Sequence, residues 1–147
     1  MRNTTLKTSI YWLSTGLLGL DFLVGGAFQI ARAPQAVEGF AHLGYPAYFV
    51  TLLGVWKILG AVVVLMPGAP RLKEWAYAGI FFDVTAAVVS VIAVGDGVAP
   101  ATLPFVFLVL TLVSWALRPA NRNLRSAREP GVEPSKVDAA TPLSAAA

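Results

Sequence analysis

Four long apolar stretches constrain this chain more than any other feature of its sequence. They run from Ser9 to Ile30, Pro46 to Met66, Trp75 to Val94 and Val98 to Leu117. The hydrocarbon core of a bilayer is about 30 Å thick, and a helix of about 20 apolar residues crosses it. Of the 147 residues, 56% are apolar and only 13% are charged, whereas soluble domains have about a quarter charged residues. The sequence therefore predicts an all-α, four-helix transmembrane bundle.

Short connections join the later stretches. The segment Pro67–Pro70 cannot continue a helix, and Gly95–Gly97 supplies a glycine-rich turn. Consecutive stretches are therefore expected to be antiparallel neighbours. The connection from Ala31 to Tyr45 is longer, and its apolar spacing predicts a short helix at the membrane interface, with Glu38 and His42 one helical turn apart.

The membrane domain is expected to cover residues 1–120, and residues 121–147 are expected to form a cytoplasmic tail. Beyond Arg128 the tail is rich in Pro, Ala, Glu and Ser without apolar periodicity, a composition typical of disordered segments. We predict that the basic segment Arg118–Arg128 binds anionic lipid headgroups rather than nucleic acid, because it begins directly at the end of a span.

Basic residues are distributed unequally between the two ends of the spans. Eight Lys and Arg residues lie at one end, and only Arg32 lies at the other. Since Lys and Arg concentrate in cytoplasmic loops, both termini are predicted to be cytoplasmic. Aromatic residues at both ends match the belts found at membrane interfaces. The eight basic residues are Arg2, Lys7, Arg71, Lys73, Arg118, Arg122, Arg125 and Arg128, and the aromatic residues are Tyr11, Trp12, Trp75, Tyr77 and Trp115 at the inner end and Tyr45 and Tyr48 at the outer end.

Three charged residues, Asp21, Lys57 and Asp83, fall near the midpoints of the first three spans. A charged residue at a helix centre in the membrane is unfavourable by about 2.5 to 3.5 kcal/mol. The arrangement that offsets this cost turns all three side chains inward, so that Lys57 contacts one or both carboxylates. The sequence allows two interpretations of this cluster, a proton or ligand site and a buried ion pair that fixes the helix register.

Small residues beside these charges predict a pocket. Glycines next to charged positions let helix backbones approach, which supports inward-facing charges. Trp56 lies at membrane depth, where it could stack on a flat ligand or pack within the bundle. The predicted pocket residues are Gly54, Trp56, Gly60, Gly79 and Ser90.

Several kinds of chemistry find no support in the residues present. The chain has no cysteine, which excludes disulfides, iron–sulfur clusters and dithiol chemistry. His42 is the sole histidine, and a lone histidine does not make a metal site. No nucleophile–base pair or phosphate-binding loop occurs, so no catalytic residue is assigned. No cofactor follows from these patterns, although quinone is kept as a candidate ligand of the pocket.

Short motifs occur in order along residues 10–120. They are Gly44-Tyr45-Pro46, Trp56-Lys57-Ile58-Leu59-Gly60, the Pro67–Pro70 turn followed by Arg71–Gly79, Val113-Ser114 and Leu117-Arg118-Pro119. Together they resemble the DoxX-like family of four-helix bacterial membrane proteins, which implies a four-helix bundle in the bacterial plasma membrane. Family names associate such proteins with thiosulfate–quinone or terminal oxidase complexes. The chain departs from the family pattern in the third span, where relatives have Gly-Ala and Ser-His and this chain has Ala86-Ala87 and Ser90-Val91.

Three functions are compatible with these patterns. The first is a non-catalytic subunit or assembly factor of a membrane complex, whose partners are lipids and other proteins. The second is a quinone- or redox-linked membrane protein with a pocket at the bilayer midplane. The third is a small transporter or proton path that uses the Asp21, Lys57 and Asp83 cluster.

Overall fold

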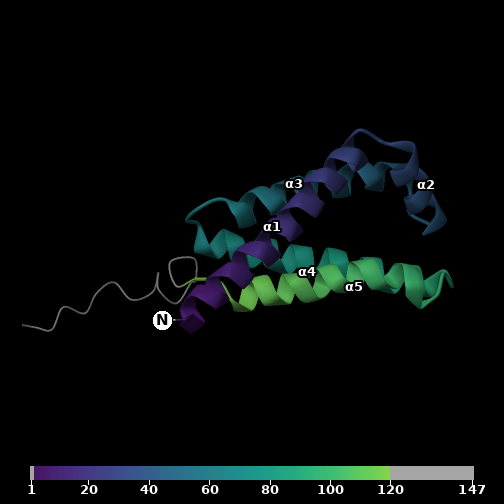
Figure 1. The fold of residues 1–147 in the computed structure, drawn as a ribbon. Helices are drawn as coiled ribbons and strands as arrows, with labels where there is room; N and C mark the ends of the chain where they lie inside the picture. Colours follow the sequence, from purple (N-terminus) through teal and green to yellow (C-terminus); the bar gives the residue numbers. More distant parts are fainter. Residues whose placement is uncertain (1, 120–147) are drawn as a thin grey trace, which may run out of the picture.

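Five helices make up the part of the chain that the structure, a computed structural model, describes, residues 2–119 (Figure 1). They are α1 (Arg2–Ile30), α2 (Pro34–His42), α3 (Ala47–Leu65), α4 (Pro70–Ala93) and α5 (Val98–Ala116). Four of them, all except α2, are long and apolar enough to cross a membrane. The predicted four-span helical fold is confirmed, and α2 confirms the short helix expected in the first connection. The predicted tail, residues 121–147, lies outside the described residues.

Two helices begin earlier than the predicted spans. α1 begins at Arg2 rather than Ser9, and α4 begins at Pro70 rather than Trp75. Apolarity marks only the part of a helix that lies in hydrocarbon, whereas a helix also continues into the polar interface. Pro70 suits the first helical position because its missing N–H needs no partner there. The first residues of α1 and α4 are therefore helical, although their hydropathy is too low to mark them as part of a membrane span.

The four long helices form a ring in which each contacts two neighbours. α1 packs against α3 and α5, and α4 packs against the same two helices. α2 packs against α1 and α3, at the far end of these helices from the N-terminus (Figure 1). We call this end the α2 end of the bundle. The opposite end, where α1 begins and α3 turns into α4, is the N-terminal end.

Residues with positive φ make the two tight turns. Gly68 and Ala69 have φ of 75° and 48° before α4, and Gly95 and Gly97 have φ of 86° and 85° before α5. Glycine adopts this conformation without the steric penalty that other residues carry. The short turns leave α4 beside α3 and α5. Consecutive spans are therefore neighbours, as the short connections predicted.

α1 and α3 approach each other at a pair of glycines. A Cβ atom on Gly54 would lie 2.8 Å from the Gly26 carbonyl oxygen, and one on Gly26 would lie 2.9 Å from the Gly54 carbonyl oxygen. Both glycines therefore allow a backbone contact that any side chain would prevent. Gly60, on the same helix as Gly54, has more room, since its Cβ would meet Ile80 at 3.7 Å.

We expect Gly54→Ala to lower the free energy of unfolding by about 1 to 3 kcal/mol, because the added methyl group must push two backbones apart. Gly60→Ala is the matched control, with the same change on the same helix and space for the methyl group. Equilibrium unfolding in mixed micelles measures both variants. Equal stabilities of the two variants would contradict the close contact between α1 and α3.

Large apolar side chains cover the outside of the bundle. Among them, Phe82 is 69% exposed and Val98 is 82% exposed, whereas monomeric soluble proteins rarely show extended apolar patches. This surface therefore contacts lipid tails. The buried core consists of Leu18, Phe22, Ala61, Val64, Tyr77, Ile80 and Val84.

Candidate functional site

Lys57 and Asp83 form an ion pair near the middle of their helices. The Lys57 Nζ atom on α3 lies 3.6 Å from Asp83 Oδ2 on α4, and their side chains are 18% and 14% exposed. The Lys57 ammonium also lies 5.2 Å from the centre of the Phe22 ring on α1, a distance typical of a cation–π contact. The charge of Lys57 is therefore held between a carboxylate and an aromatic face.

Asp21, the third residue of the predicted cluster, is less closely placed. It is half-buried on α1 and lies within electrostatic reach of both Lys57 and Asp83. Among the described residues no ion pair within 4.0 Å joins Asp21 to Lys57. Of the three predicted residues, the structure therefore brings Lys57 and Asp83 into contact, whereas Asp21 lies outside direct contact with Lys57.

A groove between α3 and α4 runs from this pair towards the N-terminal end. It has a volume of about 590 Å³ and is lined almost entirely by apolar side chains, with Lys57 and Asp83 in its wall. Trp56 and Trp75 also line it and are 63% and 80% exposed. Since exposed side chains of these spans face lipid, the groove opens sideways into the membrane.

Two of the predicted pocket residues do not line this groove. Gly54 packs against α1 through Gly26, and Ser90 is hydrogen-bonded to the Tyr45 hydroxyl at 2.7 Å near the α2 end. The prediction grouped them with Lys57 and Asp83 by helical spacing, which does not show which neighbouring helix each residue meets. The other three, Trp56, Gly60 and Gly79, do line the groove.

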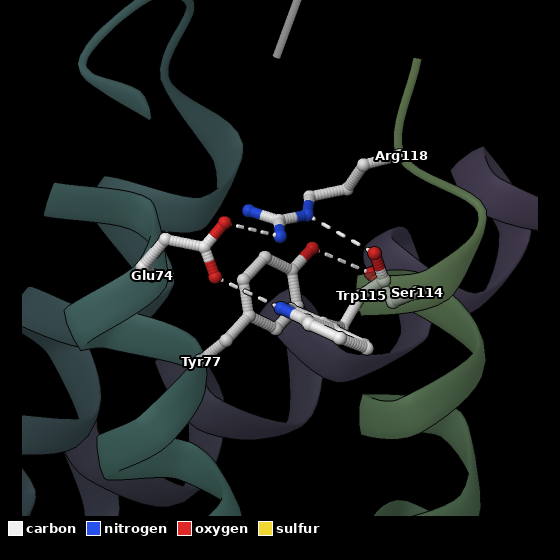
Figure 2. A network of polar contacts seen from close by, with 5 residues as sticks. All are labelled: Glu74, Tyr77, Ser114, Trp115 and Arg118. Carbon is white, nitrogen blue, oxygen red and sulfur yellow. Dashed lines mark hydrogen bonds and ion pairs between the residues drawn. The ribbon is translucent and has the colours of Figure 1, made fainter. Parts of the chain in front are cut away.

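A second polar cluster lies at the N-terminal end, between α4 and the end of α5 (Figure 2). Arg118 Nη2 donates to Glu74 Oε1 at 2.6 Å, and Trp115 Nε1 donates to Glu74 Oε2 at 2.9 Å. The Arg118 guanidinium carbon lies 4.9 Å from the centre of the Tyr77 ring. The prediction that Arg118 belongs to a lipid-binding segment was wrong for this residue, because its side chain is buried against Glu74. Residues 120–128 of that segment lie outside the described residues.

A buried hydroxyl layer continues this cluster into the bundle. The Ser114 hydroxyl is hydrogen-bonded to Tyr77 at 2.7 Å and to Thr15 at 2.7 Å, so that it joins α1, α4 and α5. Tyr11 and Tyr77 were predicted as interfacial aromatics, but they are 0% and 3% exposed. Polar groups inside a membrane bundle need protein partners because lipid offers none, and these hydroxyls supply them to one another.

Lys73 is the basic residue that differs most from its predicted position. It was expected at the membrane surface, yet it is fully buried. Its ammonium donates to the carbonyl oxygens of Val63 at 2.6 Å and Val64 at 2.9 Å, and also to that of Met66. The last carbonyls of a helix have no partner within that helix, so Lys73 closes the end of α3. Cationic side chains near a helix C-terminus can hydrogen-bond its last carbonyls, but this lysine comes from the following helix, so sequence spacing does not indicate the contact.

The α2 end has its own polar contacts. His42, the last residue of α2, contacts Asp96, which lies in the turn between α4 and α5. The His42 Nε2 atom is 2.8 Å from Asp96 Oδ1 and 3.0 Å from Asp96 Oδ2. The sequence placed His42 beside Glu38 on the same short helix, whereas its partner in the structure comes from a distant turn. Within residues 2–119 no group of three or more His, Cys, Asp or Glu residues is arranged to hold a metal ion.

Four apolar helices with lipid-facing exteriors and charges turned into the bundle define a multi-pass integral membrane protein. The sequence model of the DoxX-like family matches residues 13–114. The chain therefore belongs to the DoxX-like family, as the motifs indicated.

One segment of the chain is similar to a known bacterial protein. The chain is 36% identical over 47 residues to the uncharacterized protein YdgD of Bacillus subtilis (strain 168). That match covers 32% of this chain and 41% of the relative. No solved structure matches the chain significantly.

Proposed function

We propose that this protein is a non-catalytic subunit of a membrane complex and that it holds a lipid-soluble ligand, of the quinone type, in the groove between α3 and α4. The observation that carries the proposal is the position of the Lys57–Asp83 pair in the wall of a groove that opens into lipid. Apolar pockets with a few convergent polar groups are the usual form of a small-molecule site.

The depth of the ion pair selects the kind of ligand. The groove joins the middle of α3 and α4 to their ends near Leu72 and Trp75. A phospholipid would put its headgroup at the interface and its acyl ends against the charges, which is unfavourable for both. A quinone can place its polar ring at the charges while its apolar chain lies along the groove.

The two charged side chains suit both redox forms of such a ring. Lys57 offers N–H donors to a quinone carbonyl oxygen, and Asp83 offers an acceptor to a quinol hydroxyl. Hydrogen bonds to charged groups are stronger than those between neutral groups. Trp56, in the same wall, presents an aromatic face on which a flat ring can stack.

The wider setting is also part of the proposal. The eight-to-one distribution of basic residues supports cytoplasmic termini, with α2 on the outer side of a bacterial plasma membrane. Association with other membrane proteins through the lipid-facing helices would place the bound ligand beside a redox partner.

We expect short-chain ubiquinone to quench the tryptophan fluorescence of the full chain in nanodiscs in a saturable manner. Trp56→Phe should remove most of the saturable quenching, because Trp56 is next to Lys57, where the quinone ring is proposed to bind, whereas Trp75, the other tryptophan of the groove, lies about 12 Å further along α4 from Asp83. Trp12→Phe is the matched control, since Trp12 is an exposed tryptophan of α1 outside the groove.

The polar part of the site is tested with the neutral double variant Lys57→Met/Asp83→Asn, which leaves neither charge unpaired. We expect its ubiquinone affinity to fall about tenfold or more, the amount that one or two lost hydrogen bonds produce. Non-saturable quenching, or equal affinity of the wild type and the folded double variant, would contradict the proposed site.

A further inference from the structure

The half of the bundle nearer the α2 end contains polar groups between the surface and the Lys57–Asp83 pair. On α4, Asp83, Ala87 and Ser90 lie on one face, because they are spaced by four and three residues. Ser90 is therefore about 10 Å from Asp83 along the helix axis, towards the α2 end. Its hydroxyl meets that of Tyr45.

Gln29 of α1 adds a buried acceptor to the same half. The residue is 6% exposed, and its Cβ packs beside Gly54, one helical turn from Lys57 towards the α2 end. Its Oε1 atom has no hydrogen-bond partner among the described residues. Buried side-chain oxygens are nearly always hydrogen-bonded to protein or to water, so this atom is an acceptor available to a water molecule within the bundle.

The other half of the bundle, towards the N-terminal end, also holds buried polar groups, among them the hydroxyl layer of Thr15, Tyr77 and Ser114. Along the helices, apolar core residues at most 3% exposed lie between this layer and the ion pair, namely Leu18, Ala61, Val64 and Ile80. The groove between α3 and α4 runs through this half as well, but its lining is almost entirely apolar and it opens to lipid rather than to water. Closely packed apolar side chains leave no place for water, so they separate the ion pair from the polar groups at this end.

Tyr45 occupies the point where the α2 half of the bundle meets the surface. Its ring stacks on Phe49 at the start of α3 with a centroid distance of 4.9 Å, and its hydroxyl reaches across to Ser90 on α4 at 2.7 Å. Beyond it, the His42–Asp96 contact joins α2 to the turn between α4 and α5, with the His42 side chain 59% exposed.

We propose that the α2 half of the bundle is a one-sided access route for water and protons to the Lys57–Asp83 pair, closed by the Tyr45–Ser90 hydrogen bond. The route goes beyond the ligand groove, because it enters from the aqueous phase at the α2 end and needs no occupant between α3 and α4. Opening requires only that the Tyr45 ring leave Ser90, a side-chain motion at the edge of the bundle.

Cysteine labelling tests the route directly, because the chain has no cysteine of its own. Ala87→Cys places a thiol on the inward face between Asp83 and Ser90, while Ala86→Cys places one at the same depth on the exposed, lipid-facing side. A charged, membrane-impermeant thiol reagent is applied to each side of sealed vesicles in turn. Glu38→Cys on α2 is exposed and identifies the side that carries the α2 end.

We expect the thiol at position 87 to react only from the α2 side, and the thiol at position 86 to react from neither side. Tyr45→Phe and Ser90→Ala should each accelerate the reaction at position 87 about tenfold, since each removes the closing hydrogen bond. Thr102→Val is the control, because the Thr102 hydroxyl donates to the Val98 carbonyl of its own helix at the same end. Quinone binding is not needed for this result, so the access route and the ligand groove can fail separately.

Three outcomes would overturn the route. They are labelling of position 87 from the N-terminal side, no labelling of position 87 in any variant, and equal rates in the wild type, Tyr45→Phe and Ser90→Ala. Because two independent variants remove the same contact, a folding defect in one of them leaves the test intact.

Discussion

Lys57→Met is expected to lower the free energy of unfolding by about 3 to 5 kcal/mol, because removal of one partner of a buried ion pair leaves the other charge uncompensated. Asp83 would remain in a low-dielectric site with its ammonium partner 3.6 Å away removed. The carboxyl group must then take up a proton or stay charged without a partner. Equilibrium unfolding in mixed micelles measures the loss.

A double-mutant cycle separates the pair from the rest of the cluster. Lys57→Met/Asp83→Asn should cost much less than the sum of its single changes, since residues in direct contact do not behave additively. Lys57→Met/Asp21→Asn is the matched comparison and should be closer to additive, because Asp21 makes no ion pair with Lys57 within 4.0 Å. Additive losses in the Lys57–Asp83 cycle would show that the two charges do not stabilise each other.

Lys73→Met is expected to cost about 3 kcal/mol, because the carbonyl groups of Val63, Val64 and Met66 would lose their donor at once. No water reaches a fully buried site to replace it. The loss should appear in the same unfolding measurement, and proteolysis at the turn between α3 and α4 should accelerate.

Arg71→Met is the control for Lys73, since Arg71 carries the same charge two residues away but is exposed. Its replacement should change the free energy of unfolding by less than about 0.5 kcal/mol, as for most surface substitutions. If Lys73→Met and Arg71→Met were equally mild, the carbonyl contacts would contribute little to the end of α3.

The sequence predicted the features that depend on local pattern. The four spans follow from apolar length, the short helix α2 from spacing within Ala31–Tyr45, and the turn at Gly95–Gly97 from glycines that can adopt positive φ. The position of Lys57 and Asp83 along their spans also indicated that both lie near the middle of the membrane. Their pairing could be predicted from this shared depth, because a charge in the membrane interior has few other partners.

The remaining features depend on how helices rotate against one another, which the sequence does not specify. Lys73 and Arg118 count as interfacial charges by position, yet both turn inward because helix ends and carboxylates lie within reach of their long side chains. Likewise, helical spacing places Ser90 on the same face of α4 as Asp83, but the Ser90 hydroxyl is hydrogen-bonded to Tyr45 nearer the α2 end and does not line the groove. Asp21 shares the depth of the ion pair, yet among the described residues no ion pair within 4.0 Å joins it to Lys57.

The Lys57–Asp83 pair bears on how the chain enters the membrane during synthesis. Its two residues belong to consecutive helices joined by the short turn after Leu65. Inserted one at a time, each helix would carry a charge that disfavours entry by about 2.5 to 3.5 kcal/mol. If α3 and α4 leave the insertion machinery together as a hairpin, the charges neutralise each other before either one meets lipid. α1, which is made earlier, must instead offset Asp21 with its own apolar residues.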